Sequence, residues 1–510
     1  MRPHRILLGI ALMLTTSVSA SAQEPSGEER AALWFEAHRA RPVMLQMFLQ
    51  KMPKGGDIHT HLSGAVYAES YVGWAASAGL CANTTTGAIG PCGAPSSEAR
   101  PVTDALRDPA LYSLIVDGLS TRNLANQPQS GHDQFFDAFA KFRAATKDRS
   151  ADMVAELATR AADQNVTYLE IMLTVGGDAL WTLAGGVRFD ANDFAASRQR
   201  LLEAGLARAV EVGRAELDKL EQQIDAVLGC GREPRPPACG VGRRYLEQAS
   251  RTSEPNMVFA QLVYGFELAR ADRRVVGVNM VAPEDFYVAR RDYSLHMRMV
   301  GWLNDLHGTV KVALHAGELT LGLVPPSDLR FHIREAVEVA KARRIGHGVD
   351  LAYERDAMQL LAEMKRRDVL VEICLTSNDV ILGVRGSRHP FPEYMNAGVP
   401  VTLATDDEGV SRIDLTNEYL RAAETYGLGY RQLKQLSRNG LTYSFLAGDS
   451  LWRSAPDAQP VAACAGARPD QPPPPTCQSF LNASDKARQQ WNLERAFHSF
   501  EAAGWAVESP

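Results

Sequence analysis

The chain has 510 residues, of which 45% are hydrophobic and 22% are charged, a composition close to that of an average folded protein. This composition excludes wholesale disorder, and the length fits either about three ordinary domains or one large α/β barrel with additions. The 54 Lys and Arg residues are outnumbered by 60 Asp and Glu residues, which gives a net charge of −6. Because no basic run is present, we expect neither nucleic acid nor an anionic membrane as a partner.

The first residues have the three parts of a secretory signal peptide. Arg2 and Arg5 precede an apolar run from Ile6 to Leu14, and small residues then lead to Ala20-Ser21-Ala22. A membrane-spanning helix needs about 20 apolar residues, and this run is much shorter. We therefore expect residues 1–22 to be a signal peptide, and the mature protein to be periplasmic or extracellular without a membrane anchor.

The cysteines agree with export. Six of the seven form three pairs that are close in sequence, namely Cys81 with Cys92, Cys230 with Cys239, and Cys464 with Cys477. No C-x2-C spacing typical of a zinc ribbon is present. Three local disulfides in an oxidising compartment are the simplest prediction, although six cysteines allow other pairings. Cys374 follows an apolar run and is predicted to be a buried free thiol.

Residues 23–50 are predicted to form an N-terminal helical extension, and short apolar runs then alternate with amphipathic helices. The predicted strands are Asp57–Leu62, Val166–Leu173, Met257–Tyr264, Arg274–Val281, Val310–His315, Arg344–His347, Val369–Leu375 and Val399–Thr405. This alternation indicates parallel pairing. Eight strands that are buried on both faces favour an α/β fold of the (β/α)8 TIM-barrel type, over residues 51–453, rather than an open sheet.

Several segments exceed ordinary barrel connections and are predicted to be helical insertions. Residues 100–162 include Phe135, Phe136 and Phe139 at helical spacing, which is more typical of a core than of a lid over a site. Residues 192–228 are predicted to form one long amphipathic helix. This helix could either form an oligomer interface or cover the barrel, so the sequence leaves a homodimer as one possibility. Residues 454–510 are predicted to form a Pro-rich loop followed by a C-terminal helix.

Polar residues lie at the C-terminal ends of the predicted strands, which face the active-site mouth in such barrels. They are His59 and His61 after the first strand, His315 and Glu318 after the fifth, His347 after the sixth, and Asp406 and Asp407 after the eighth. Strand alternation directs His59 and His61 to the same side. Three imidazoles and one carboxylate, without a thiolate, suit Zn²⁺ with an open position for water.

Five motifs occur in order, namely MPKGGDIHTHLSG, HAGE, RIGHG, TSN and TDDEG. Together they resemble the adenosine deaminase family of metal-dependent barrel amidohydrolases, over roughly residues 53–409. The export signal and the additional loops resemble the secreted, growth-factor-related branch of that family. The resemblance implies one Zn²⁺ per chain, bound by His59, His61, His315 and Asp406.

The resemblance also implies the catalytic roles. Glu318 protonates N1 of the purine, His347 orients hydroxide as a base, and Asp407 forms a hydrogen bond with N7. The implied reaction converts adenosine or 2′-deoxyadenosine to inosine or 2′-deoxyinosine and ammonia. The H-x-E and P-C-x-x-C signature of nucleic-acid base deaminases is absent from the sequence.

The implied substrate-binding residues are His61, Ser63, Ala282 and Asp407, and two of them depart from the family. Ser63 stands where the family usually has Asp, and Ala282 stands where it commonly has Gly. These departures leave a second activity possible, that of a barrel amidohydrolase that acts on a different aminopurine or cyclic amidine. A nucleoside-binding signalling protein with the same fold is a further alternative, and it would be expected to show damage to the catalytic set.

Overall fold

The computed structural model describes residues 24–93, 98–454 and 458–505, so the predicted signal peptide lies outside the described residues. Eight strands form one sheet in chain order, and every neighbouring pair is parallel. They are β1 (Gly55–His61), β5 (Val166–Leu173), β6 (Gly242–Ser250), β7 (Val275–Val281), β8 (Lys311–Ala316), β9 (Arg344–His347), β10 (Leu370–Ile373) and β11 (Val401–Leu403).

The first and last strands meet at a parallel bridge between Thr60 and Asp406. There the His61 N–H donates to the Asp406 carbonyl at 3.1 Å, and the Asp406 N–H donates to the His59 carbonyl at 2.9 Å. These bonds bring the two edges of the sheet together. The predicted barrel is therefore confirmed.

One predicted strand is wrong. Met257–Tyr264 lies inside helix α12 (Pro255–Ala271), and the third barrel strand is β6 instead. Both faces of α12 are buried, so its continuous apolar run has the composition of a buried strand and cannot be distinguished from one by periodicity. β6 escaped prediction because its sequence, GRRYLEQAS, is rich in charged and polar residues.

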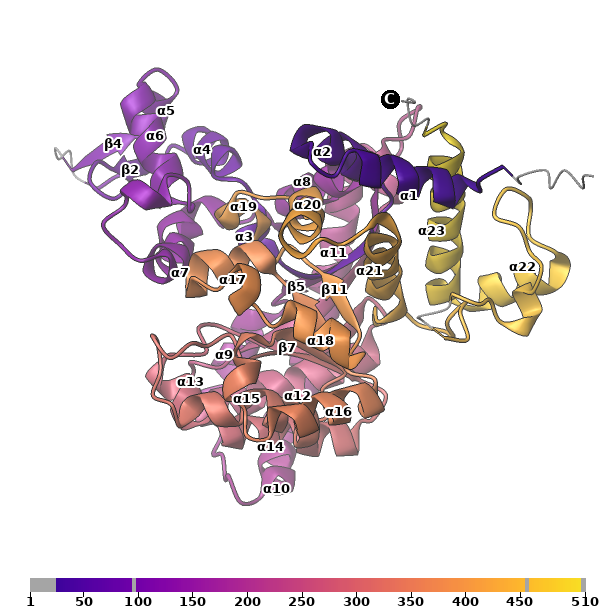
Figure 1. Cartoon of the computed structure of the whole chain (residues 1–510). Helices are drawn as coiled ribbons and strands as arrows, with labels where there is room; N and C mark the ends of the chain where they lie inside the picture. Colours follow the sequence, from indigo (N-terminus) through magenta and orange to yellow (C-terminus); the bar gives the residue numbers. More distant parts are fainter. Residues whose placement is uncertain (1–23, 94–97, 455–457, 506–510) are drawn as a thin grey trace, which may run out of the picture.

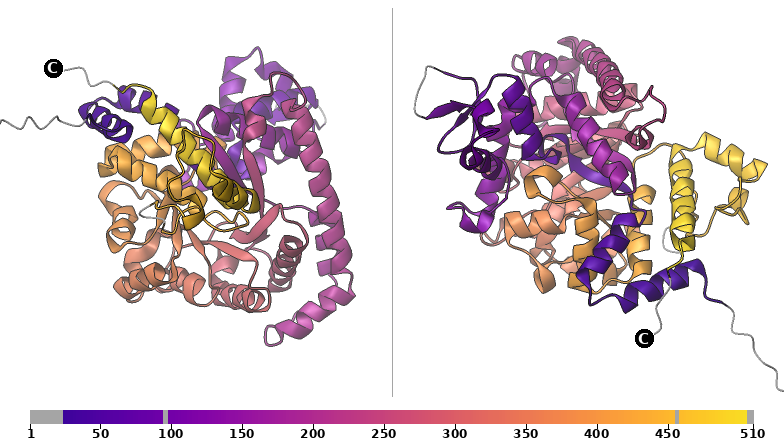
Figure 2. Two further views of the ribbon diagram at one scale, coloured as in Figure 1. Left: turned by 90° about the vertical axis from the view of Figure 1, so that its right-hand side faces the viewer. Right: turned by 90° about the horizontal axis from the view of Figure 1, so that it is seen from above.

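The N-terminal extension is helical, as predicted, but it consists of α1 (Gly27–Ala37) and α2 (Pro42–Lys51). Pro42 is the first residue of α2, a position that tolerates the missing N–H. Both helices lie beside α23 (Asp485–Ala502), with the ring centroids of Phe48 and Phe500 4.9 Å apart. The two ends of the described chain thus pack on the same side of the barrel (Figures 1 and 2).

The longest insertion separates β1 from β5, and its elements β2, β4, α4, α5 and α6 form the lobe at the upper left of Figure 1. It contains an antiparallel sheet in the order β3-β2-β4. Its elements are α3 (Leu62–Ala65), α4 (Ala68–Ser77), β2 (Cys81–Asn83), β3 (Ile89–Gly90), β4 (Ala99–Pro101), α5 (Val102–Ala105), α6 (Pro109–Gly118), α7 (Gly131–Phe142) and α8 (Ser150–Asp163).

The predicted long helix over residues 192–228 is two helices, α10 (Phe194–Glu203) and α11 (Leu206–Leu228). Gly205 separates them with φ 108°, a conformation that favours glycine. The buried face of α11 packs against α8 and α12, so this helix covers the barrel (Figure 2).

Further helices complete the described chain. They are α9 (Gly177–Ala184), α13 (Tyr287–Arg291), α14 (Tyr293–Leu306), α15 (His332–Glu338), α16 (Ala357–Arg367), α17 (Leu375–Leu382), α18 (Phe391–Ala397), α19 (Glu408–Ser411), α20 (Leu415–Tyr426), α21 (Tyr430–Thr442) and α22 (Pro475–Ala483). No helix within residues 24–93, 98–454 and 458–505 is both long and apolar enough to cross a membrane.

The three predicted disulfides are confirmed: Cys81–Cys92, Cys230–Cys239 and Cys464–Cys477. Cys374 is a free and buried cysteine, as predicted. Three disulfides agree with an oxidising compartment.

We expect alkylation of the native, unreduced protein to leave Cys374 unmodified, because its side chain is 1% exposed and burial raises the pKa of its thiol well above the usual value. Denaturation without reductant should make this one cysteine reactive. Mass spectrometry of the alkylated peptides measures the outcome, and a second reactive cysteine after denaturation would contradict the disulfide pattern.

Candidate active site

A cavity of about 540 Å³ opens at the C-terminal ends of the barrel strands. Eight predicted residues line it: His61, Ser63, Ala282, His315, Glu318, His347, Asp406 and Asp407. His59 does not line the cavity and lies fully buried beside these residues. The structure therefore brings all nine predicted site residues to one place.

Four of these side chains form a compact cluster. The candidate ligand atoms of His59, His61, His315 and Asp406 all lie within 4.8 Å of one another. The Nε2 atoms of His59 and His61 are each 3.3 Å from Asp406 Oδ1. The Nε2 atoms of His61 and His315 are only 3.0 Å apart.

The donor set of the cluster fits a metal ion. The Nε2 atom of His59 is buried and has no hydrogen-bond partner among the described residues. Buried polar atoms are rarely left without a partner, and imidazole nitrogens that converge with a carboxylate are typical of zinc sites. The chemistry of these four residues is therefore that of a metal site with nitrogen and oxygen ligands.

Hydrogen bonds on the outer side of the cluster fix its side chains. His59 Nδ1 is 2.6 Å from Glu372 Oε2, and His315 Nδ1 is 2.9 Å from Asn279 Oδ1. Each contact leaves the Nε2 lone pair free to point inward, which is the usual arrangement around metal-binding histidines. Ser377 Oγ donates to Asp406 Oδ2 at 2.7 Å.

A second, overlapping set of possible ligands consists of His59, His347, Cys374 and Asp406. Cys374 is a poor ligand here, because only a thiolate binds metal well and burial raises the pKa of this thiol well above its usual value. The set with three imidazoles is therefore the better metal site.

Buried ion pairs extend the cluster toward the other end of the barrel. Arg344 Nε is 2.6 Å from Glu372 Oε1, and Arg344 Nη1 is 2.7 Å from Glu170 Oε2. All three side chains are fully buried. A buried charge needs such partners because removing either one leaves an uncompensated ion.

Glu318 and His347 face each other across the cavity, with His347 Nε2 3.7 Å from Glu318 Oε1. Burial, together with the negative charges of Asp406 and Glu284, raises the pKa of Glu318 well above its usual value. Burial lowers the pKa of His347 to about 3, against the attraction of Asp406. The two shifts favour the neutral form of each group, a carboxyl that can donate a proton and an imidazole that can accept one.

Further side chains hold these two groups in place. Glu284 accepts the N–H groups of Gly317 and Glu318 at 3.1 and 3.0 Å. Asn378 Nδ2 is 2.9 Å from His347 Nδ1, and Asn378 Oδ1 is 3.0 Å from His389 Nε2. Both contacts orient reacting groups without entering the cavity.

Asp407 presents an oxygen, Oδ1, that is buried and has no hydrogen-bond partner among the described residues. Burial and the neighbouring Asp406 raise the pKa of Asp407 well above its usual value, so its carboxyl can donate a hydrogen bond. A Cβ atom at Gly64 would lie 1.6 Å from Asp407 Oδ1. Only glycine at position 64 leaves room for this side chain.

The backbone is strained where it carries the site. Ala282, His347 and Asp406 have φ values of 81°, 69° and 61°. Residues other than glycine rarely adopt such values, and they do so most often at functional sites. The φ of Ala282 gives a physical reason why glycine would suit this position.

The outer wall of the cavity comes largely from the insertion between β1 and β5. Phe135, Phe136 and Phe139 of α7 all line the cavity, and Phe135 is only 2% exposed. We predicted that these aromatic residues belong to the core, with a lid over the site as the alternative. The helix combines both roles, because Phe135 is buried and all three residues line the cavity. Arg143 lies at the same wall.

Sequence reasoning missed Glu372, Arg344, Glu284 and Asn279. Glu372 and Asn279 are polar residues within apolar strands, Arg344 is the first residue of β9, and Glu284 lies in the loop after β7. A polar residue within an apolar strand must find a partner inside the barrel, and that signal could have identified Glu372 and Asn279.

The structure thus combines a parallel α/β barrel with a His/Asp cluster at its C-terminal face whose donor atoms fit a metal ion. Residues 214–453 match the family model described as adenosine deaminase. This part of the chain therefore has the sequence features of the adenosine deaminase family.

Curated relatives match over short stretches. The chain is 36% identical over 142 residues to adenosine deaminase of Enterococcus faecalis, which covers 28% of this chain and 39% of that protein. It is 41% identical over 133 residues to aminodeoxyfutalosine deaminase of Streptomyces coelicolor, which covers 26% of this chain and 32% of that protein. The matched stretches thus span less than half of these relatives.

Solved structures agree in fold. The N6-methyl-AMP deaminase of Arabidopsis thaliana in its apo form superimposes with a TM-score of 0.50 at 20% identity, over 79% of this chain and 95% of that chain. A second structure of the Arabidopsis enzyme gives a TM-score of 0.51 over 79% and 96%. At this identity the likeness shows the shared barrel fold alone.

We expect Glu372→Gln to weaken metal binding by about 10–100-fold, because the carboxylate that orients His59 and balances Arg344 is lost. Competition with a chromogenic chelator measures this affinity. Glu354→Gln is the matched control, since Glu354 is a buried glutamate that accepts the backbone N–H groups of Ile333 and Arg334, outside the cluster. Equal affinity in the two variants would exclude the orienting role of Glu372.

Proposed function

We propose that this chain is a zinc-dependent deaminase that converts adenosine and 2′-deoxyadenosine to inosine and 2′-deoxyinosine with release of ammonia. The observation that carries the proposal is that the His/Asp cluster, Glu318 and His347 come together at one cavity, where burial raises the pKa of Glu318 and lowers that of His347. His59, His61, His315 and Asp406 would hold one zinc ion. Zinc in such a site lowers the pKa of a bound water toward 7 and so supplies a nucleophile at neutral pH.

Glu318 acts as the proton donor. Addition of water at C6 of the purine breaks the aromaticity of the ring, and a proton delivered to N1 compensates for the negative charge that develops there. The raised pKa of Glu318 keeps this proton on the carboxyl group until it is needed. General acid catalysis of this kind contributes about 10²–10⁴-fold in rate.

His347 takes the proton that the attacking water gives up. Its Nδ1 contact with Asn378 fixes the ring. The acceptor role requires the tautomer that carries its proton on Nδ1, with the amide oxygen of Asn378 facing this atom, because only then does Nε2 keep a lone pair. The proton taken from the water can then pass to the departing amino group, which leaves as ammonia, and the proton that remains on the new C6 oxygen returns to the Glu318 carboxylate as the carbonyl forms. One water enters and one ammonia leaves, so no further reactant is needed.

Asp407 and Ala282 are proposed to recognise the purine. The protonated Asp407 carboxyl donates to N7, and the Ala282 N–H donates to N3. Ser63 lines the cavity, and we propose that it faces the sugar, to which it offers a hydroxyl instead of a carboxylate. This change leaves the preference between sugars to be decided by experiment.

Two other functions are compatible with the same cavity. Ser63 and Ala282 favour a related activity on a different aminopurine, and similarity to an aminodeoxyfutalosine deaminase agrees with it. A nucleoside-binding signalling role without turnover has less support, because the proposed catalytic set is intact. We further propose that the chain is exported through its N-terminal signal, as the three disulfides support.

The substrate proposal predicts a defined specificity. We expect the mature protein to release ammonia from adenosine and 2′-deoxyadenosine but not from adenine, AMP or guanosine, because the cavity must hold both the purine and a neutral sugar. The change in ultraviolet absorbance when the aminopurine becomes an oxopurine and an ammonia assay both report turnover. Turnover of another aminopurine alone would support the related activity instead.

Glu318→Gln should keep its metal and still bind inosine, because size and polarity are preserved. We expect turnover to fall by roughly 10²-fold or more, because an amide cannot serve as the acid. Metal analysis and steady-state kinetics are measured on the same preparation. Loss of the metal would make Glu318 a ligand, and turnover within a few-fold of wild type would refute N1 protonation.

His315→Ala should remain folded but hold well below one zinc ion per chain, with loss of activity, because it removes one of the four proposed ligands. Chelation should inactivate the wild-type protein, and added Zn²⁺ should restore it. His307→Ala is the matched control, since His307 lies outside the cavity near Glu267. Full zinc occupancy in His315→Ala would remove this residue from the ligand set.

A further inference from the structure

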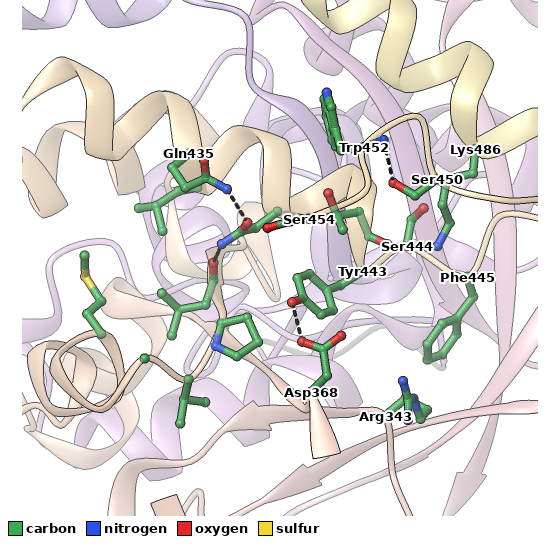
Figure 3. Close-up of a pocket in the computed structure, with 18 of the residues that line it drawn as sticks. Arg343, Asp368, Gln435, Tyr443, Ser444, Phe445, Ser450, Trp452, Ser454 and Lys486 are labelled. Carbon is green, nitrogen blue, oxygen red and sulfur yellow. Dashed lines mark hydrogen bonds between the residues drawn. The ribbon is translucent and has the colours of Figure 1, made fainter. Parts of the chain in front are cut away.

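A second cavity lies at the opposite end of the barrel, against the N-terminal ends of β8, β9 and β11 (Figure 3). Its volume is about 740 Å³, larger than that of the candidate active site. Its walls come from the barrel, from α21 and from the segment that leads to the C-terminal helix α23. No step of the proposed reaction uses this cavity.

The charges that line this cavity are strongly biased. Four cationic residues line it, namely Lys311, Arg343, Arg453 and Lys486, against one acidic residue, Asp368. The Asp368 carboxylate already accepts the Tyr443 hydroxyl at 2.6 Å. Within the described part of the chain, none of the four cations forms an ion pair. This excess is notable in a chain whose net charge is −6.

The positive charges also act on one another. Lys486 enters from α23 beside Ser444, and Arg343 lies below Phe445 (Figure 3). Burial, and then the positive charges of Arg344, Lys311 and Arg343, lower the pKa of Lys486 to about 8, against the attraction of Glu170. Unpaired cations held close together are costly unless a counter-charge binds among them.

We propose that this cavity is a second binding site, for a small phosphate-bearing anion, in which Lys486 and Arg343 are the principal ligands. Lysine supplies a compact point charge, and arginine supplies planar donors that match phosphate oxygens. Lys311 and Arg453, which are exposed like Arg343, add positive charge to the lining of the cavity.

This site has a physical route to the metal cluster. Phe445, which lines the cavity, carries the Arg344 guanidinium 3.8 Å from its ring centroid. Arg344 in turn pairs with Glu372, which contacts His59. An anion bound against Phe445 therefore lies two side chains away from the carboxylate that orients a proposed ligand.

The test is calorimetric titration of the mature, full-length protein with inorganic pyrophosphate. We expect saturable binding of one anion per chain that weakens as salt rises, because the attraction is electrostatic. Lys486→Gln and Arg343→Gln should each weaken this binding by about tenfold or more. Lys219→Gln, which removes an exposed cation on α11, should leave it unchanged.

Two further measurements separate this site from the catalytic one. Saturating inosine should leave the pyrophosphate affinity unchanged, and both variants should retain nucleoside turnover, which shows that they are folded. Titration near pH 8 in two buffers of different ionisation enthalpy should reveal proton uptake by the wild type but not by Lys486→Gln. Absence of saturable binding, competition by inosine, or equal weakening in Lys219→Gln would each overturn the proposal.

Discussion

The contact between Glu372 and His59 is the interaction on which the site most depends. It fixes the imidazole whose Nε2 points into the metal cluster, and it requires Arg344 to balance its charge. Arg344 then requires Glu170. These four residues come from β10, β1, β9 and β5, so only a closed barrel brings them together. Because desolvation of each buried charge costs several kcal/mol, an incomplete set would destabilise the barrel itself.

Closure of the barrel also explains the strained backbone at the site. Asp406 forms the bridge to Thr60 with φ 61°, and the same residue presents its carboxylate to His59 and His61. An extended conformation at this residue would continue the strand and direct the carboxylate elsewhere. Strain of this kind costs about 1–3 kcal/mol per residue and persists only where surrounding contacts hold it. Here the two backbone hydrogen bonds to β1 supply those contacts.

Much of this arrangement could be predicted from the sequence, because polar residues at strand ends mark the mouth of a barrel whatever its loops do. The alternation of strands and helices, the strand-end histidines and the cysteine pairs were all readable in this way. The third strand could not be predicted in this way. The buried helix α12 has the apolar composition expected of a strand, whereas β6, the actual third strand, is rich in charged and polar residues. Glu372 and Arg344 were missed because each makes sense only beside a partner from another strand.

Chemistry and specificity have different structural origins in this molecule. The groups proposed to act on the purine ring follow β8, β9 and β11, whose positions are fixed by the sheet. The remaining wall of the cavity comes instead from α7 of the long insertion and from Phe286 in the loop after β7. Insertions tolerate substitution far better than barrel strands do. Under the proposed function, change in this wall would alter which substrate enters while the residues of the barrel strands stay in place, so the basis of substrate preference would lie in the insertion.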